Sequence, residues 1–454
     1  MRRLWVTVAV TDRSDALAPM VDDLIRQTQQ ANVELSLFIV ENSRASSERE
    51  VNGTLFNRLL ATGVEVDYTA QAPFGRSIAH SRRRQREWVK CRLQRESAPD
   101  AIWMLDDDNR LDHLSHDGTL SVRPLEHHVT RLMAMARQPD RPDLLIGTVT
   151  GDPPIPAAAT IASRAVDVAA NLQALFDAHP GDASGWVLAS LRVVGEFDDY
   201  YDLSHERAVP TWEVPCRWLT QSVDPSVQET AHEILREALL LGSGVALTRP
   251  ILTRKSRLDE QWTGYRRGGN AVFFNPDACL DHAYPSLELC GVQTRRGDMI
   301  GAYLLGRSYT VVTSGFSVRH CRARRVGPMT QNGFETSLLA DNLGACLARA
   351  VSAPNPVGGA SAFLYARLAS IQAAMCASEV ALGAILALVG DCPEWIEPEA
   401  ARALAAHVAL LREALPLVEG GLTPTIVEAM TCDTTAARIG EEALRLRAQL
   451  GESQ

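Results

Sequence analysis

The sequence has almost no lysine, few aromatic residues and no long apolar segment. Lys90 and Lys255 are the only lysines, so 43 of the 45 basic residues are arginines, and 55 acidic residues give a net charge of −10. An acidic chain without a known nucleic-acid-binding motif does not favour a nucleic-acid partner. The apolar run at 380–390 is about half of the ~20 residues needed to cross a bilayer. We therefore expect a cytoplasmic protein with neither nucleic acid nor membrane as its partner.

The nine cysteines are dispersed, and no two of them form a Cys-x-x-Cys pair. This pattern argues against a disulfide framework and against a zinc cluster. A chain of 454 residues exceeds the ~250 to 300 residues at which a single core stops growing. Ala- and Leu-rich segments with the 3.6-residue periodicity of helices begin after about residue 329. We therefore predict one domain over 1–330 and a helical bundle over 331–454. The apolar stripes of this bundle are expected to pack on the first domain or on a second copy of the chain.

In the first part of the chain, continuous apolar runs alternate with segments whose apolar residues recur at helical spacing. Strands are predicted at 4–10, 35–40, 64–68 and 101–105, and helices at 15–30, 47–62 and 77–95. The alternation indicates parallel strands in an α/β fold. Residues 111–235 have no clear pattern, apart from a helix near 125–136 and a strand near 143–149, and are interpreted as an elaborated region with substrate loops. Beyond it, we expect strands at 244–247, 271–274 and 311–318.

Polar residues follow three of these strands. They are Thr11 and Asp12, then Glu41, then Asp106, Asp107 and Asp108. In open α/β sheets the carboxyl ends of the strands form one edge, where ligands bind. Adjacent carboxylates repel one another unless a cation compensates them, and Asp106 and Asp108 can point the same way. We predict that these two residues hold Mg²⁺ or Mn²⁺ together with a substrate diphosphate, the alternative being a solvated acidic turn.

Taken in order, these motifs resemble the GT-A glycosyltransferases, most nearly the family-2-like nucleotide-sugar transferases. The resemblance covers roughly 4–110 and 240–325, and it implies a Rossmann-like, mostly parallel sheet flanked by helices. It places the nucleoside against the ends of the first two strands and a Gly-containing basic segment before the acidic motif. The residues it assigns to nucleotide-sugar binding are Thr11, Asp12, Glu41 and Asp107, and the arginines nearest the predicted phosphate are Arg76 and Arg82.

The second half of the chain extends the resemblance. Gly268, Gly269 and Asn270 are similar to the family's Gly-rich loop at the sugar or acceptor. Asp298 resembles the catalytic base of inverting members, although Gly297 stands where the family usually has Glu; capping of a helix is the alternative role.

Two further features of the family lie after this segment. His320 resembles a metal-binding histidine at the end of a strand. The arginines that follow resemble a lid over the diphosphate, with a solvated basic loop as the alternative. These arginines are Arg322, Arg324 and Arg325.

The resemblance implies a transferase that moves a sugar from a UDP- or GDP-sugar to a soluble acceptor. The reaction is expected to need Mn²⁺ or Mg²⁺ and to be inverting, with Asp298 as base. A retaining GT-A enzyme acting on a small acceptor and a non-catalytic nucleotide-binding module are the alternatives. A haloacid-dehalogenase-type phosphatase is disfavoured because Arg110 stands where Thr or Val is required. A nucleotidyltransferase is disfavoured because no glycine follows the first strand.

Overall fold

The computed structural model describes residues 2–12, 14–70, 78–116, 120–151, 261–262, 269–321, 331–390, 402, 405–406 and 424–448. Several sequence predictions fall outside these residues. They concern Arg76, Gly268, the three arginines of the expected lid, the strand at 244–247 and the greater part of the region 111–235.

The first half of the described sheet is parallel. Its strands are β1 (Arg2–Val10), β2 (Val33–Glu41), β3 (Glu65–Ala70) and β4 (Ala101–Asp106), in the order β3-β2-β1-β4. The connecting helices are α1 (Ser14–Gln30), α2 (Ser46–Ala61) and α3 (Ile78–Leu93). All seven elements lie within a few residues of their predicted bounds, because each has a continuous apolar run or a helical repeat to mark it.

The second half of the sheet is mixed. β10 (Asn270–Phe273) runs antiparallel between β4 and β8 (Leu144–Gly151), and β13 (Val311–His320) lies parallel to β8. Two short strands, β5 (Asn109–Arg110) and β9 (Gln261–Trp262), pair antiparallel with β13. The predicted α/β class with helices flanking a sheet is confirmed, while β10 enters it in the antiparallel direction.

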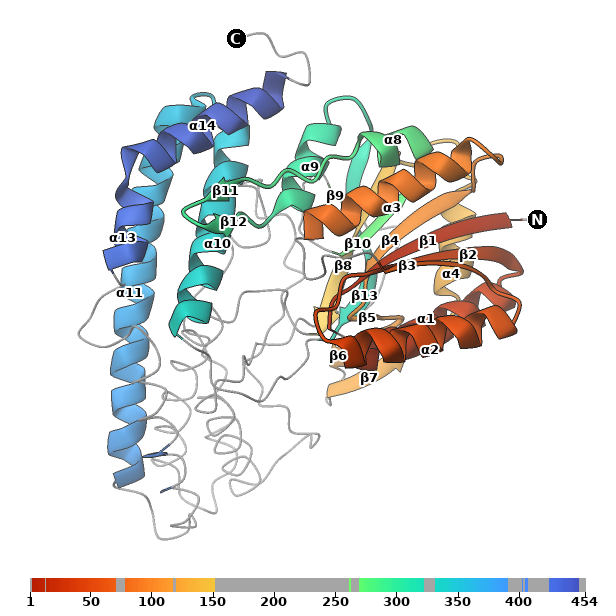
Figure 1. Cartoon of the computed structure of the whole chain (residues 1–454), viewed down its shortest axis with the longest axis horizontal. Coiled ribbons are helices and arrows are strands. Elements are labelled where there is room, and N and C mark those ends of the chain that lie inside the picture. The colour runs from red at the N-terminus through yellow and green to blue at the C-terminus, as the bar shows by residue number, and fades with distance from the viewer. Residues whose placement is uncertain are drawn as a thin grey trace.

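Helices cover both faces of this sheet (Figure 1). Alternate residues of β1 point to opposite faces, so that Leu4 and Val6 join one core and Trp5 joins the other. The first core contains side chains of α1, α2 and α4 (His128–Met135). The second contains side chains of α3, α8 (Pro276–Asp281) and α9 (Gly297–Leu305).

Two hairpins and four C-terminal helices complete the described fold. The hairpins are β6 (Asp112–His116) with β7 (Leu120–Pro124) and β11 (Glu288–Leu289) with β12 (Val292–Gln293). The helices are α10 (Gln331–Ser352), α11 (Pro356–Gly390), α13 (Pro424–Thr431) and α14 (Asp433–Ala448), which pack together beside the sheet (Figure 1). α10 also contacts α9 and β12, so the helical region rests on the sheet-containing part of the chain. Among the described helices, none is long and apolar enough to cross a lipid bilayer.

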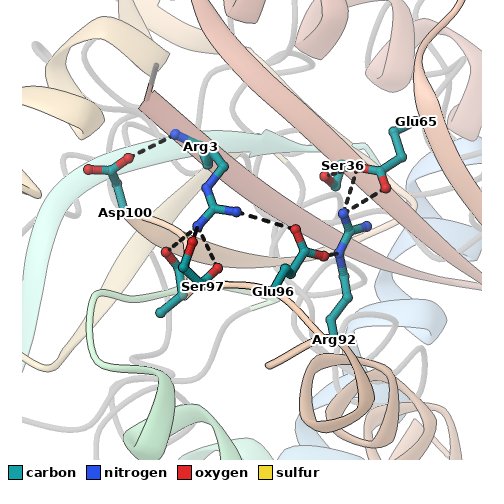
Figure 2. A network of polar contacts seen from close by, with 8 residues as sticks. Arg3, Ser36, Glu65, Arg92, Glu96, Ser97 and Asp100 are labelled. Atoms are coloured by element: carbon teal, nitrogen blue, oxygen red, sulfur yellow. Dashed lines mark hydrogen bonds and ion pairs between the residues drawn. The ribbon is translucent and has the colours of Figure 1, made fainter. Parts of the chain in front are cut away.

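A polar network fastens the amino-terminal ends of β1 and β3 (Figure 2). The backbone N–H of Arg3 donates to Asp100 at 2.8 Å, and its guanidinium lies 3.3 Å from Glu96. Arg92, at the end of α3, donates to both carboxylate oxygens of Glu65, at 2.7 and 2.6 Å. These contacts join α3 to the end of the sheet opposite the acidic motif, which leaves the other end for the functional site.

We expect Glu65→Gln to lower the free energy of unfolding at pH 7 by about 0.5 kcal/mol, which is in the range for an ion pair whose carboxylate is exposed to solvent. Burial acts to raise the pKa of Glu65, but hydrogen bonds from Arg92 and Ser36 outweigh it, and the pKa lies below its ordinary value of 4.5. The carboxylate therefore stabilises the folded state above pH 4.5 and loses this effect as the pH falls below that value. Urea unfolding at pH 7 and pH 3.5 measures the difference, with the exposed Glu50→Gln as control. An equal effect at both pH values would contradict the prediction.

Candidate functional site

Asp106 lies at the end of β4 against α3 and the residue before β10. Its carboxylate forms an ion pair with Arg82, whose side chain is 4% exposed. Arg82 also donates to Gln85 at 3.0 Å, which fixes the guanidinium on the buried side of α3. The backbone N–H of Asp106 donates to the carbonyl oxygen of Gly269 at 3.0 Å. A Cβ atom on Gly269 would overlap the Asp106 carboxylate, so a larger residue here requires the Asp106 side chain to move.

Asp108 and His320 lie side by side at the same edge. β5 places Asn109 opposite His320 in the antiparallel register, and Cys321 donates its N–H to the carbonyl oxygen of Asp108 at 2.8 Å. The imidazole Nε2 of His320 is consequently 2.9 Å from Oδ2 of Asp108, with the two side chains 11% and 19% exposed. The structure thus brings together two of the three predicted metal ligands, which lie 212 positions apart in the sequence.

Asp298 faces the same cluster from the first turn of α9. The pKa of Asp106 is raised, chiefly by burial and further by the charges of Asp108 and Asp298, while Arg82 and His320 act in the opposite direction. The three carboxylates therefore repel one another, and nearby positive charges offset this repulsion only in part. A bound cation would relieve this repulsion.

The start of α9 leaves no room for a side chain at position 297. A Cβ atom at Gly297 would meet the carbonyl oxygen of Pro285, so a Glu side chain has no room here. The N-cap of α9 is Arg296, which makes no side-chain capping bond, and Asp298 is the second residue of the helix. Asp298 is therefore not the N-cap residue of this helix.

Tyr284 is a member of the cluster that the sequence did not indicate. Its ring lies under Arg82, with the guanidinium carbon 5.6 Å from the ring centroid. Burial raises the pKa of Tyr284 to about 12, Arg82 opposes the shift, and the charges of Asp298 and Asp106 add to it. The hydroxyl remains protonated at neutral pH and can donate a hydrogen bond. No motif surrounds Tyr284 in the sequence, so only the packing of 282–285 under α3 reveals it.

The residues predicted for the nucleoside lie at the ends of β1 and β2. Thr11 is exposed and donates its N–H to Asp107 at 2.9 Å, which joins the end of β1 to the acidic motif. Asp12 accepts two backbone N–H groups just before α2, at 2.8 and 3.2 Å. Thr11, Asp12 and Asp107 thus share one edge of the sheet, as predicted from the strand ends.

Two other predicted residues are buried and bonded to the protein. Glu41 accepts bonds from the N–H of Ser43 and the side chains of Asn52 and Tyr68, at 2.7, 2.7 and 3.2 Å. Asn270 accepts from Trp103 at 2.8 Å and donates to the carbonyl oxygen of Phe316 at 2.9 Å. These bonds hold the two side chains in the interior, where they support the strands that carry the site.

The donor set suits a hard divalent cation. In the described part of the chain, no three His, Cys, Asp or Glu side chains are grouped closely enough to hold a metal by themselves. Mg²⁺ typically takes one or two protein carboxylates and completes its shell with water and substrate phosphate, and imidazole suits Mn²⁺. Asp108 and His320, with Asp106 beside them, fit this pattern. The buried amide oxygen of Asn109, which has no hydrogen-bond partner in the described structure, is a further oxygen at the same turn.

Comparison with known proteins gives distant likenesses only. No model of a protein family matches the chain, and no curated protein matches its sequence. One similar solved structure is the mannosyltransferase PcManGT from Pyrobaculum calidifontis in complex with GDP-Man and Mn²⁺, with a TM-score of 0.36, 11% identity and coverage of 98% of this chain and 88% of that one. Another is S. aureus TarS 1–349 in complex with UDP, with a TM-score of 0.34, 8% identity and coverage of 91% and 90%. TM-scores of this size support no conclusion about function. The function has to be inferred from the residues of the site.

We expect Gly269→Ala to lower the free energy of unfolding by about 1 to 3 kcal/mol, the range for inserting a methyl group into a packed site. The added Cβ would displace the Asp106 carboxylate from its place beside Arg82. Gly53→Ala is the matched control, because a Cβ there meets nothing within 4 Å and the position lies within α2. The control should gain about 0.5 to 1 kcal/mol from helix propensity. Urea denaturation measures both, and two variants of equal stability would contradict the expected contact.

Proposed function

We propose that this protein is a glycosyltransferase that moves a sugar from a nucleotide-diphosphate sugar to an acceptor nucleophile with the help of a divalent cation. The observation that carries the proposal is the meeting of Asp106, Asp108, His320 and Asp298 at one edge of the sheet. This arrangement combines a place for a cation with an acid that can accept a proton. The proposed donors are UDP- and GDP-sugars, and the proposed acceptor is soluble.

The reaction requires one bond to form and one to break at the anomeric carbon. Asp298 accepts the proton of the acceptor hydroxyl, and the acceptor oxygen forms a bond to the anomeric carbon. The bond from that carbon to the diphosphate oxygen breaks, and the nucleoside diphosphate leaves with the electron pair. Attack from the face opposite the leaving group inverts the anomeric configuration, which is the stereochemical course we propose.

The residues of the site have different roles in the proposed reaction. Asp108 and His320 would hold the cation, with Asp106 adding negative charge beside them. When bound, the cation supplies Lewis-acid stabilisation of the charge on the departing diphosphate. Arg82 favours the ionised form of Asp106 and holds its carboxylate in place, and the protonated Tyr284 hydroxyl can donate to an oxygen of the substrate.

The donor test uses release of the nucleoside diphosphate from a panel of UDP- and GDP-sugars with Mn²⁺, Mg²⁺ or EDTA. We expect release with the metals and its loss with EDTA, and we expect Asp108→Asn to reduce the rate by about a hundredfold or more, since a lost cation removes several kcal/mol of charge stabilisation. Asp22→Asn, which alters an exposed pair between Asp22 on α1 and Arg58 on α2, is the control and should keep the full rate. Release that Asp108→Asn leaves unchanged would disprove the cation site.

The proposed base is tested with Asp298→Asn, for which we expect kcat to fall by about 10² to 10⁴-fold with little change in nucleotide affinity. Asn keeps the size of the side chain and removes its ability to accept the proton. Asp433→Asn, in the first turn of α14, controls for the loss of an acid at a helix start. NMR of the first-formed product gives its anomeric configuration. Retention of configuration together with a small effect of Asp298→Asn would favour the retaining alternative.

A non-catalytic nucleotide-binding module is the second alternative. The single acid at 297–298 favours this alternative, but the Pro285 carbonyl oxygen, which a Cβ at Gly297 would meet, gives the missing acid a steric cause. Calorimetry with UDP and GDP distinguishes the cases, because tight binding without turnover of any donor would support the module.

A further inference from the structure

The segment that leads into α9 lies directly on the C-terminal helical region. The backbone N–H of Arg295 donates to the carbonyl oxygen of Ala340, in α10, at 3.1 Å. The next residue, Arg296, is left-handed, with φ 69° and ψ 20°. A residue other than glycine adopts this conformation only when its surroundings hold it there. The contacts with α10 are therefore part of what fixes the start of α9.

Arg296 is held through its side chain by a buried carboxylate. Its guanidinium lies 3.3 Å from Oδ2 of Asp341, in α10, and the two side chains are 3% and 4% exposed. Arg367, in α11, approaches the same carboxylate at 4.0 Å and donates to the side chain of Asn342 at 2.7 Å. Asp341 thus lies between two arginines, one from each part of the molecule. A buried charge of this kind is tolerated only when its partners keep their places, which makes the geometry of the group strict.

Arg296 in turn sets the first turn of α9. Its carbonyl oxygen accepts the N–H of Ile300 at 3.1 Å, which is the first hydrogen bond of the helix. Asp298 lies between these two residues, so a displacement of Arg296 moves the backbone that carries the Asp298 carboxylate. Two polar contacts join α14 to the β11–β12 hairpin and do not involve Arg296. They are the bond from Arg438 to the Glu288 carbonyl oxygen and the contact of Cys290 with Thr435.

We propose that Asp341 is a positioning residue for Asp298, acting through Arg296, so that the C-terminal helical region takes part in assembling the active site. The inference rests on the proposed function for its catalytic consequence. Its structural part, the control of the first turn of α9 by a charge in α10, is independent of any activity. Among the described residues, Asp106, Arg82 and Tyr284 interact electrostatically with Asp298, and all three lie outside the helical region.

The test compares Asp341→Asn with Arg438→Ala in the full-length protein. Asp341→Asn keeps the side-chain volume and removes the charge, while Arg438→Ala removes a different contact of the helical region. Hydrogen exchange of the amides in 299–305 is measured for both, with the amides of β1 as reference. In the transferase assay, kcat and the KM for the donor are measured, and calorimetry gives nucleotide affinity.

We expect Asp341→Asn to exchange faster in α9 than the wild type while β1 is unchanged, and Arg438→Ala to match the wild type. We expect kcat to fall about ten- to a hundredfold, as for a misplaced catalytic group, with donor KM and nucleotide affinity within about twofold. Asp341→Glu, which restores the charge, should recover part of kcat.

Three results would overturn the proposal: wild-type exchange in α9 for Asp341→Asn, equal effects of both variants, or a loss confined to KM. If the wild type turns over no donor, the proposed function fails, and the exchange of α9 alone then decides the role of Asp341. If Asp341→Asn does not fold, Arg296→Lys takes its place, because it keeps the charge and loses the planar fork that faces Asp341.

Discussion

The site depends on the antiparallel placement of β10 beside the end of β4. This register brings Gly269 against Asp106, and the carbonyl oxygen of Gly269 accepts bonds from the Asp106 backbone and from Asn109 at 3.0 and 2.9 Å. The acidic motif is therefore fixed at its backbone before any side chain of the site is considered. β8 and β13 continue the sheet from β10, and the position of His320 follows from that continuation.

The electrostatic balance of the site sets a second constraint. Asp106, Asp108 and Asp298 bring three negative charges to a partly enclosed edge, and Arg82 and His320 are the neighbouring basic groups that act on Asp106. Burial of Arg82, on α3, strengthens its attraction for Asp106, because fewer water molecules screen it. An arrangement of this kind is suited to a ligand that arrives with a cation and carries its own negative charge.

The sequence predicted the elements whose pattern is local and missed the relations that are not. The continuous apolar runs of β1, β2 and β4 and the repeats of α1 to α3 marked those elements, and the carboxyl ends of parallel strands placed Asp12 and Asp107 at one edge. The antiparallel direction of β10 cannot be predicted from its short sequence, Asn-Ala-Val-Phe, because the pattern of a strand is the same in both directions. Tyr284 and Asp341 stand in no motif, and their place beside Arg82 and Arg296 comes from tertiary packing. Glu41 was predicted to bind the nucleotide because it is an acid at the end of a strand. Its hydrogen-bond partners Asn52 and Tyr68 lie on other elements and enclose it, which the sequence does not reveal.

The order of strands along the chain has a consequence for biosynthesis. In the finished sheet β4 lies between β1 and β10, but β10 follows β4 only after a long stretch of sequence. Trp103 in β4 and Asn270 in β10, whose side chains are hydrogen-bonded, are 167 residues apart. While the chain emerges from the ribosome, β1 to β4 can pair and cover their faces with α1 to α3. The edge of β4 that pairs with β10 stays unpaired until β10 has been synthesised. An apolar strand with unpaired backbone groups is prone to pair with other chains, and pairing over such a sequence distance is slow. Chaperones that shield strand edges during synthesis would therefore matter more for this protein than for one whose neighbouring strands follow each other along the chain.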